Sequence, residues 1–137
     1  MGAIGSPIVV GYIDSPEGKA ALQRAVEEAS QRGARLIVIN SHKGGAALDK
    51  HVAAELDESL DEVHAVLHDS GVEHEVRQLV RGSDPSDDLI AVAEEVDADL
   101  IVIGLRRRTP VGKLILGSNA QQVLLDASCP VLAVKAP

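Results

Sequence analysis

The sequence predicts a single α/β domain with a parallel sheet that is flanked by helices. Its 137 residues fit one domain and suffice to bury a core. Short aliphatic runs alternate with segments of helical periodicity, which is typical of parallel strands joined by right-handed crossovers. The core must be aliphatic, because the chain contains no Phe or Trp and only one Tyr. Such a core suits strands that are covered by helices.

Five aliphatic or alternating runs predict the strands. They span residues 8–13, 36–39, 72–81, 100–103 and 131–134. The first, second and fourth are continuous and rich in β-branched residues, as expected for strands buried on both faces. The run 72–81 alternates between apolar and polar residues and is therefore expected at an edge of the sheet.

Helices are predicted between successive strands. The first begins after Ser15, a suitable capping residue, with Pro16 in the first helical position, and it ends at Gly33. Helical spacing of apolar residues predicts three further helices, over residues 48–70, from the turn at 82–85 to about 96, and over 114–127. The predicted order of elements is therefore β-α-β-α-β-α-β-α-β.

Charge and composition limit the classes of partner. The 13 basic and 21 acidic residues give a net charge of -8, which argues against binding to nucleic acid or to anionic membranes. A single cysteine, Cys129, excludes a disulfide framework within the chain. We find no signal peptide and no apolar run that approaches the roughly 18 residues of a membrane span. We expect a cytoplasmic protein with a flexible tail at residues 1–6 and one domain at 7–137.

Two loops are candidates for ligand binding. In open parallel sheets, ligands bind beyond the carboxyl ends of strands, at the point where the strand order reverses. The candidate loops follow the first and fourth strands, at residues 11–15 and 104–111. Gly104 would allow a phosphate to approach the backbone, and residues 117–119 offer backbone N–H groups and a hydroxyl to an anion. The three arginines 106–108 add fork-shaped donors, although charge runs are often only solvated loops.

Two familiar phosphate loops are absent. A Walker loop requires Ser or Thr after Gly-Lys, whereas Gly112-Lys113 is followed by Leu114. The dinucleotide fingerprint Gly-x-Gly-x-x-Gly does not follow the first strand either.

Four motifs together resemble the universal stress protein family across residues 8–135. They are Val-Val-Gly-x-x-x-Ser-Pro-Glu at 9–17, Ala-Asp-Leu-Ile-Val-Ile-Gly at 98–104, Leu-Gly-Ser at 116–118 and Cys-Pro-Val-Leu-Ala-Val-Lys at 129–135. The resemblance implies a five-stranded, doubly wound parallel sheet with the strand order 3-2-1-4-5. It also implies a dimer, and membership of either the ATP-binding or the non-binding branch of the family.

ATP-binding members carry the pattern Gly-x2-Gly-x9-Gly-Ser/Thr. By resemblance, its first glycine maps to Gly104 and its last pair to Gly117 and Ser118, while Arg107 occupies the middle glycine position. Arg107 could pair with phosphate or fill its place. The aspartate that contacts the nucleotide in binders is replaced by Ile13, and Asp14 follows; Asp14 is either a helix-capping residue or a ligand contact.

The resemblance therefore predicts a site for ATP, with Mg²⁺, or for a related nucleotide. The backbones of residues 11–13 and of Ser41 are expected to face the base and ribose, and the remaining residues to face the ribose and phosphates. The predicted site comprises Gly11, Tyr12, Ile13, Asp14, Ser41, Ile103, Gly104, Arg106, Arg107, Gly117, Ser118 and Asn119.

Three functions are compatible with these observations. The first is a stress-response regulatory protein that binds a nucleotide and changes its affinity for protein partners that remain to be identified. The second is a nucleotide-free interaction protein, favoured by Ile13 and Arg107, which would form a homodimer through the last strand. The third is an enzyme acting on a phosphorylated small molecule, but the sequence supplies no recognisable catalytic set around Ser118. His64 and His68 have helical spacing without an evident third metal ligand and are interpreted as surface residues.

Overall fold

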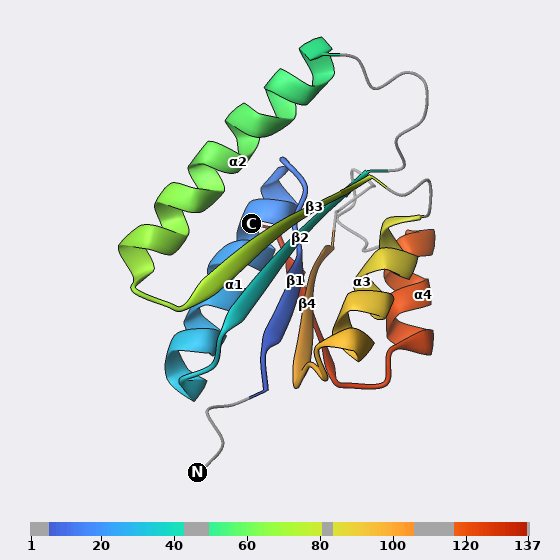
Figure 1. Cartoon of the computed structure of the whole chain (residues 1–137). Coiled ribbons are helices and arrows are strands. Elements are labelled where there is room, and N and C mark those ends of the chain that lie inside the picture. The colour runs from blue at the N-terminus through green and yellow to red at the C-terminus, as the bar shows by residue number, and fades with distance from the viewer. Residues whose placement is uncertain (1–5, 43–49, 81–83, 106–116, 137) are drawn as a thin grey trace.

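A computed structural model describes residues 6–42, 50–80, 84–105 and 117–136 of the chain. These residues form a parallel sheet of five strands in the order β3-β2-β1-β4-β5, which confirms the predicted fold class and strand order. The strand order reverses between β1 and β4, at the centre of the sheet (Figure 1). The strands are β1 (Ile8–Gly11), β2 (Leu36–His42), β3 (His74–Val80), β4 (Leu100–Leu105) and β5 (Val131–Lys135).

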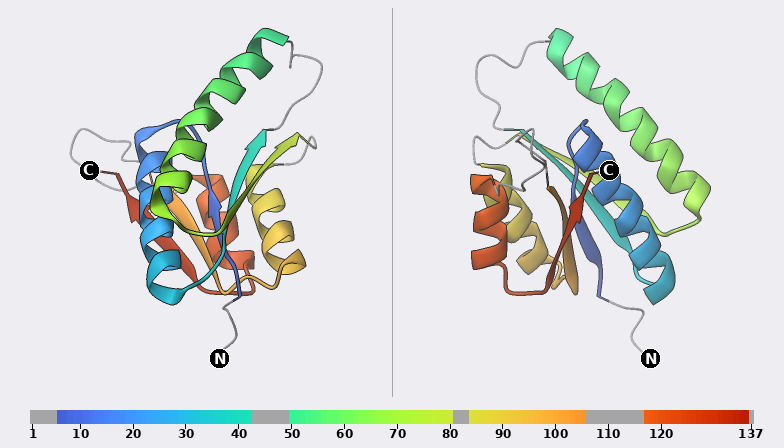
Figure 2. Two further views of the ribbon diagram at one scale, coloured as in Figure 1. Left: turned by 60° about the vertical axis from the view of Figure 1, so that its left-hand side comes forward. Right: turned by 180° about the vertical axis from the view of Figure 1, so that it is seen from behind.

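Four helices cover the two faces of the sheet. The pair α1 and α2 lies on one face and the pair α3 and α4 on the other, as Figures 1 and 2 show from three directions. None of the described helices combines the length and the apolar character that crossing a bilayer requires. The helices are α1 (Pro16–Arg32), α2 (Lys50–Ser70), α3 (Pro85–Glu95) and α4 (Ser118–Asp126).

The ends of α1 follow the predicted capping. The Ser15 hydroxyl accepts a hydrogen bond from the backbone N–H of Gly18 at 3.0 Å, and Pro16 occupies the first turn. Gly33 ends the helix with a φ of 62°, a left-handed conformation that glycine adopts without a steric penalty.

Several predicted boundaries differ from the structure, and three of these lie close to the carboxyl edge of the sheet. The first strand ends at Gly11 rather than at residue 13, because the Ser15 N–H donates to the Ile13 carbonyl and turns the chain into α1. The fourth strand continues to residue 105, so Gly104 does not open a loop. The last helix begins at Ser118, since Gly117 before it is extended with a ψ of 165°.

Other boundaries shift by a few residues. The edge strand β3 begins at His74 instead of residue 72, and β2 extends to His42. The predictions made for residues 1–5, 43–49, 81–83 and 106–116 lie outside the described residues.

The core has two layers because successive side chains of a strand point to opposite faces. Val10, Val38 and Val102 belong to the layer beneath α1 and α2, which also contains Tyr12 at 2% exposure. Val9 and Ile39 belong to the layer beneath α3 and α4. Aliphatic residues thus fill both layers, as the composition predicts.

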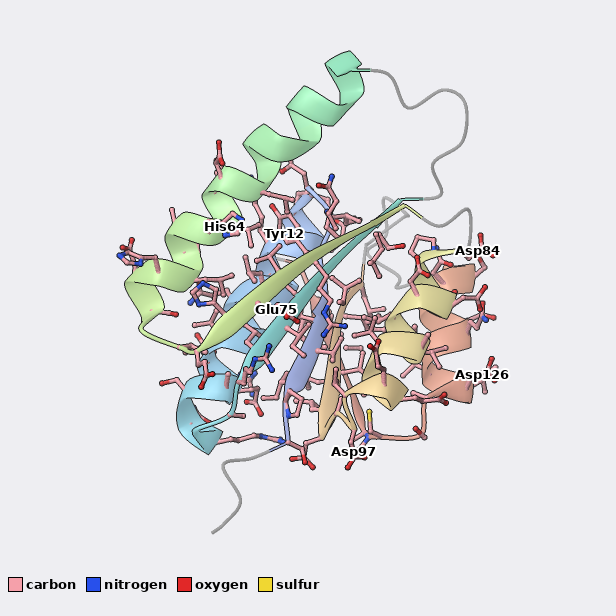
Figure 3. All side chains as sticks on the ribbon, viewed as in Figure 1. Tyr12, His64, Glu75, Asp84, Asp97 and Asp126 are labelled. Carbon is pink, nitrogen blue, oxygen red and sulfur yellow. The ribbon has the colours of Figure 1, made fainter. Side chains whose placement is uncertain are left out.

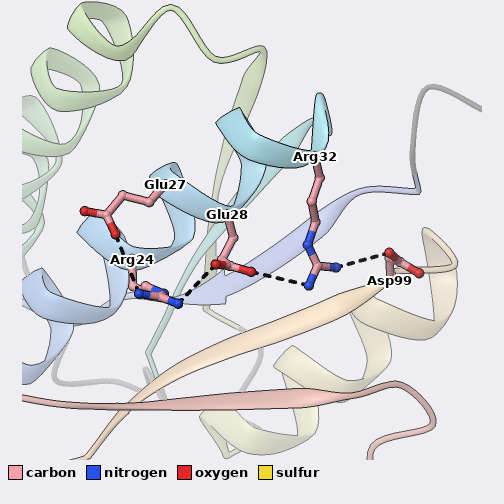
Figure 4. A network of polar contacts seen from close by, with 5 residues as sticks. All are labelled: Arg24, Glu27, Glu28, Arg32 and Asp99. Carbon is pink, nitrogen blue, oxygen red and sulfur yellow. Dashed lines mark hydrogen bonds and ion pairs between the residues drawn. The ribbon is translucent and has the colours of Figure 1, made fainter.

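A surface network of ion pairs lies at the end of the molecule where β4 begins. Arg32, at the end of α1, lies 3.3 Å from Asp99, which precedes β4, and 3.3 Å from Glu28 (Figure 4). Figure 3 shows that Asp97 lies at this amino edge of the sheet, whereas Asp84, before α3, lies at the opposite, carboxyl edge. The two edges therefore differ in the elements that surround them.

Candidate ligand site

A cavity of about 180 Å³ lies at the carboxyl edge of the sheet, at the reversal of strand order. Its walls come from the ends of β1, β2 and β4, the start of α1, and the helices α3 and α4. This volume is smaller than the roughly 300–1,000 Å³ of pockets that enclose a drug-sized ligand, so it suits a single ring system. The lining residues are Gly11, Tyr12, Ile13, Glu17, Gly18, Ile39, Ser41, Pro85, Ser86, Leu89, Ile103, Gly104, Asn119, Ala120 and Val123.

The structure brings most of the predicted site residues to this cavity. Those that line it are Gly11, Tyr12, Ile13, Ser41, Ile103, Gly104 and Asn119. Gly117 and Ser118 do not line it, but they immediately precede Asn119 at the start of α4. Arg106 and Arg107 lie outside the described residues.

Asp14 is not among the lining residues. Its carboxylate lies 3.7 Å from the Lys19 ammonium, with both side chains largely exposed. The N-cap of α1 is Ser15, so Asp14 does not take the capping role either. Ile13, half exposed at 50%, provides an apolar wall at the position where the resemblance places an aspartate in ATP binders.

The turn after β1 is fixed to β2 by two hydrogen bonds. The Tyr12 N–H donates to the Ile39 carbonyl at 2.9 Å, and the buried Asn40 side chain donates to the Tyr12 carbonyl at 3.1 Å. The Tyr12 side chain packs in the core layer beneath α1 and α2. The first loop of the site is therefore held by the sheet itself.

Two glycines allow α1 to lie close to β4 and to the turn after β1. A Cβ on Gly104 would lie 2.2 Å from the Glu17 carbonyl oxygen, and one on Gly18 would lie 1.9 Å from the Ile13 carbonyl oxygen. Both distances are far below van der Waals contact. Gly104 thus admits the backbone of α1, a reason for glycine that differs from the phosphate contact expected from the sequence.

A buried pair joins β2 to α3 beside the cavity. The Ser41 hydroxyl donates to Oδ2 of Asp88 at 2.5 Å, and the two residues are only 7% and 3% exposed. The sequence interpretation assigned Ser41 a backbone contact and gave Asp88 no role.

Polar side chains also join α3 to α4. The Ser86 hydroxyl lies 3.0 Å from Oδ1 of Asn119 and 2.8 Å from Oε1 of Gln122, and its single proton can serve only one of these acceptors at a time. The Gln122 side-chain amide donates to Asp87 at 2.5 Å. These contacts fix the helix pair that forms the outer wall of the cavity.

Sequence reasoning missed the walls supplied by helices. Glu17, Ser86 and Leu89 line the cavity although no ligand motif contains them. One available signal is Pro85, which marks a helix start directly after an edge strand and therefore at the carboxyl edge of a parallel sheet. Within the described ranges, no group of three or more His, Cys, Asp or Glu side chains is arranged to hold a metal ion.

Comparison with known proteins gives one consistent family. The profile of the Universal stress protein family matches residues 6–135. A universal stress protein of Mycolicibacterium smegmatis is 48% identical over 128 residues, which cover 93% of this chain and 96% of that protein. A structure of a universal stress protein from Archaeoglobus fulgidus aligns with a TM-score of 0.84 and 41% identity, covering 96% of this chain and 99% of that one. An Archaeoglobus fulgidus universal stress protein in complex with dAMP aligns with a TM-score of 0.79 and 36% identity, covering 97% of this chain and 100% of the other.

Proposed function

The chain belongs to the universal stress protein family, and on this premise we propose that it is a cytoplasmic stress-response regulator that binds an adenine nucleotide. The observation that carries the proposal is the cavity at the reversal of strand order, which seven residues chosen from the sequence line. The dAMP complex of the Archaeoglobus fulgidus protein supports the nucleotide class.

The shape and lining of the cavity suit a purine base. Aliphatic side chains of Ile39, Leu89, Ile103 and Val123 form much of its wall and favour a flat, weakly polar ring. We propose that the backbone of residues 11–13 and Ser41 contacts the base and ribose.

The phosphates of ATP, with Mg²⁺, are proposed to extend out of the cavity. At 180 Å³ the cavity has room for the base end of the nucleotide only. Gly117 and Ser118 lie beside it at the amino end of α4, where backbone N–H groups favour anions. Arg106 and Arg107, by sequence position, would supply positive charge. Binding would favour one arrangement of the loops at this edge and so change the affinity for a protein partner.

The edge strand β5 favours a second role as a dimeric interaction protein. Its residues Val131 to Val134 are only partly buried, and within the described part of the chain β5 pairs with β4 alone. An apolar edge with free backbone groups is usually covered. We propose a homodimer in which β5 of one chain pairs with β5 of a second copy. This dimer would form whether or not the protein binds a nucleotide.

Calorimetric titration with ATP and with AMP, in the presence of Mg²⁺, tests the proposed function. We expect saturable binding by the wild-type protein. Ala120→Leu fills the cavity from α4 and should weaken binding by at least about tenfold. Leu125→Gln is the matched control, since Leu125 is 82% exposed on the same helix. An absence of saturable binding at millimolar ATP, in a protein that is a dimer by light scattering, would leave only the interaction role.

A further inference from the structure

A groove lies between α1 and α2, which run side by side on the face of the sheet opposite to α3 and α4 (Figure 2). It consists of two hollows, of about 380 and 530 Å³, that share the lining residues Gln23 and Val66. Along α1 its lining extends from Lys19 to Gln31. This span corresponds to about 18 Å of helix, or about three turns.

The floor of the groove is apolar and well packed. Leu22 and Val26 of α1 and Val63 of α2 line it, and each is at most 8% exposed. Val66 differs, because it lines both hollows and is 37% exposed. An exposed apolar residue at the middle of a groove is suited to contact an apolar anchor of a partner.

The charged residues of the groove are mainly acidic. Its lining includes the carboxylates of Glu27, Glu62 and Asp69, together with the ammonium of Lys19. The Lys19 ammonium lies 3.7 Å from both Glu62 and Asp14, so one negative charge of this trio is in excess. Among the described residues, no ion pair involves Asp69. The groove therefore favours a basic partner.

The acidic and apolar residues of the α2 wall have a helical spacing. Glu27 of α1 lies 3.9 Å from Arg24, so the excess negative charge is on the α2 side. There Glu62, Val66 and Asp69 occupy positions i, i+4 and i+7, on one side of the helix. The two acidic positions are thus about 10.5 Å apart along the axis, with the exposed valine between them.

We propose that this groove is a docking site for an amphipathic helix of a partner protein, with an apolar stripe flanked by Lys or Arg. A partner helix of about three turns would place its apolar residues on Val66 and the floor, as in other helix-in-groove complexes. Basic residues one turn before and after the central apolar anchor would face Glu62 and Asp69. The proposal goes beyond the proposed function and does not require a nucleotide, because the groove residues of α1 and α2 do not line the cavity.

Charge distinguishes this partner from other occupants. A second copy of this chain would present the same acidic groove, and each chain has a net charge of -8, so two such faces would repel each other. Nucleic acid and anionic bilayers are repelled for the same reason.

Fluorescence anisotropy of the full chain with a labelled peptide tests the proposal. The peptide has about 15 residues of Ala, Leu and Lys, with leucines at every third or fourth position and lysines on both flanks of this stripe. A peptide of the same composition, with leucines spread around the helix, is the control. The amphipathic peptide should bind about tenfold more tightly or better. Equal affinity for the two peptides, or no binding of either at millimolar protein, would overturn the proposal.

Val66→Asp separates docking from general electrostatic attraction. The added negative charge alone would tighten binding of the basic peptide, whereas loss of the apolar contact should weaken it by about tenfold. Leu125→Asp is the matched control, because it adds the same charge on α4, across the sheet, at a residue that is 82% exposed. It should not weaken binding. Unchanged or tighter binding by folded Val66→Asp would overturn the proposal.

Asp69→Asn removes one charge from the groove with little change of shape. It should weaken peptide binding by about threefold, while Asp126→Asn at the end of α4 should have a smaller effect. Equal effects of the two variants would show that net charge, rather than the groove, attracts the peptide. Circular dichroism verifies that each variant is folded. Titration of the same samples with AMP distinguishes a failure of this proposal from a failure of the proposed function.

Discussion

Asn40 and Ser41 are neighbours on β2, yet they serve opposite faces of the sheet. The Asn40 side chain bonds the turn after β1, where the Tyr12 side chain packs in the aliphatic layer beneath α1 and α2. Ser41 lies on the other face, which opens into a cavity between β4, α3 and α4. The two faces share the same strands and the same aliphatic composition. The presence of the cavity beside Ser41 therefore depends on the carboxyl ends of the strands and on the helices that cover them.

Replacing one leucine by alanine on each face of the sheet tests whether the two faces differ in ligand binding. These substitutions also have the largest expected effect on stability. Leu67 of α2 is fully buried in the layer beneath α1 and α2, so Leu67→Ala should lower the free energy of unfolding by about 2–5 kcal/mol without changing nucleotide affinity. Leu89 lines the cavity, and Leu89→Ala should cost less stability while weakening nucleotide binding. Urea denaturation and calorimetry measure the two quantities. Equal effects of both variants on binding would remove the distinction between the faces.

The next largest effect on stability is expected where α1 lies close to the carboxyl edge of the sheet. Gly18→Ala places a methyl group against the Ile13 carbonyl and should destabilise the protein by about 1–3 kcal/mol. Gly11→Ala is the matched control, because its new Cβ would meet only the end of the flexible Leu89 side chain at 3.2 Å. We expect a smaller change there. A Gly11→Ala variant that loses as much stability in urea as Gly18→Ala would contradict this account.

The smallest expected effect concerns the reactivity of the Cys129 thiol, which lies at the amino edge of the sheet. Burial raises the pKa of the Cys129 thiol, and the negative charge of Asp99 raises it further. The favourable contribution of the protonated thiol to stability is intact below its ordinary pKa and is lost as the pH rises through the raised value. At pH 8, iodoacetamide should therefore alkylate Cys129 more slowly in the folded protein than in urea. Asp99→Asn should speed alkylation of the folded protein, and no change in rate would exclude the charge effect.

The sequence predicted the elements of the fold well because the relevant signals are local. Aliphatic runs identify the strands, and Ser15 and Gly33 mark the ends of α1. The strand order came from the resemblance, since periodicity does not say which strands are neighbours.

The site was predicted less completely because its outer wall depends on tertiary packing. Ser86 and Leu89 reach the cavity only when α3 lies on the face opposite to α1, which no local pattern reveals. Asp14, chosen from the sequence, does not line the cavity, because the strand ends earlier and its carboxylate lies near the Lys19 ammonium. Gly104 lines the cavity, and its missing side chain also accommodates the backbone of Glu17, a steric role that the sequence pattern did not indicate.

The most direct test of the central claim is a titration of ¹⁵N-labelled protein with AMP, followed by amide chemical shifts. We predict that the shifts are concentrated at residues that line the cavity, namely Gly11, Ile13, Ser41, Gly104 and Asn119. Amides of α2 on the other face of the sheet, such as those of Val63 and Leu67, should change little. Shifts concentrated on α1 and α2, or none at saturating AMP, would contradict the claim that the ligand occupies this edge of the sheet.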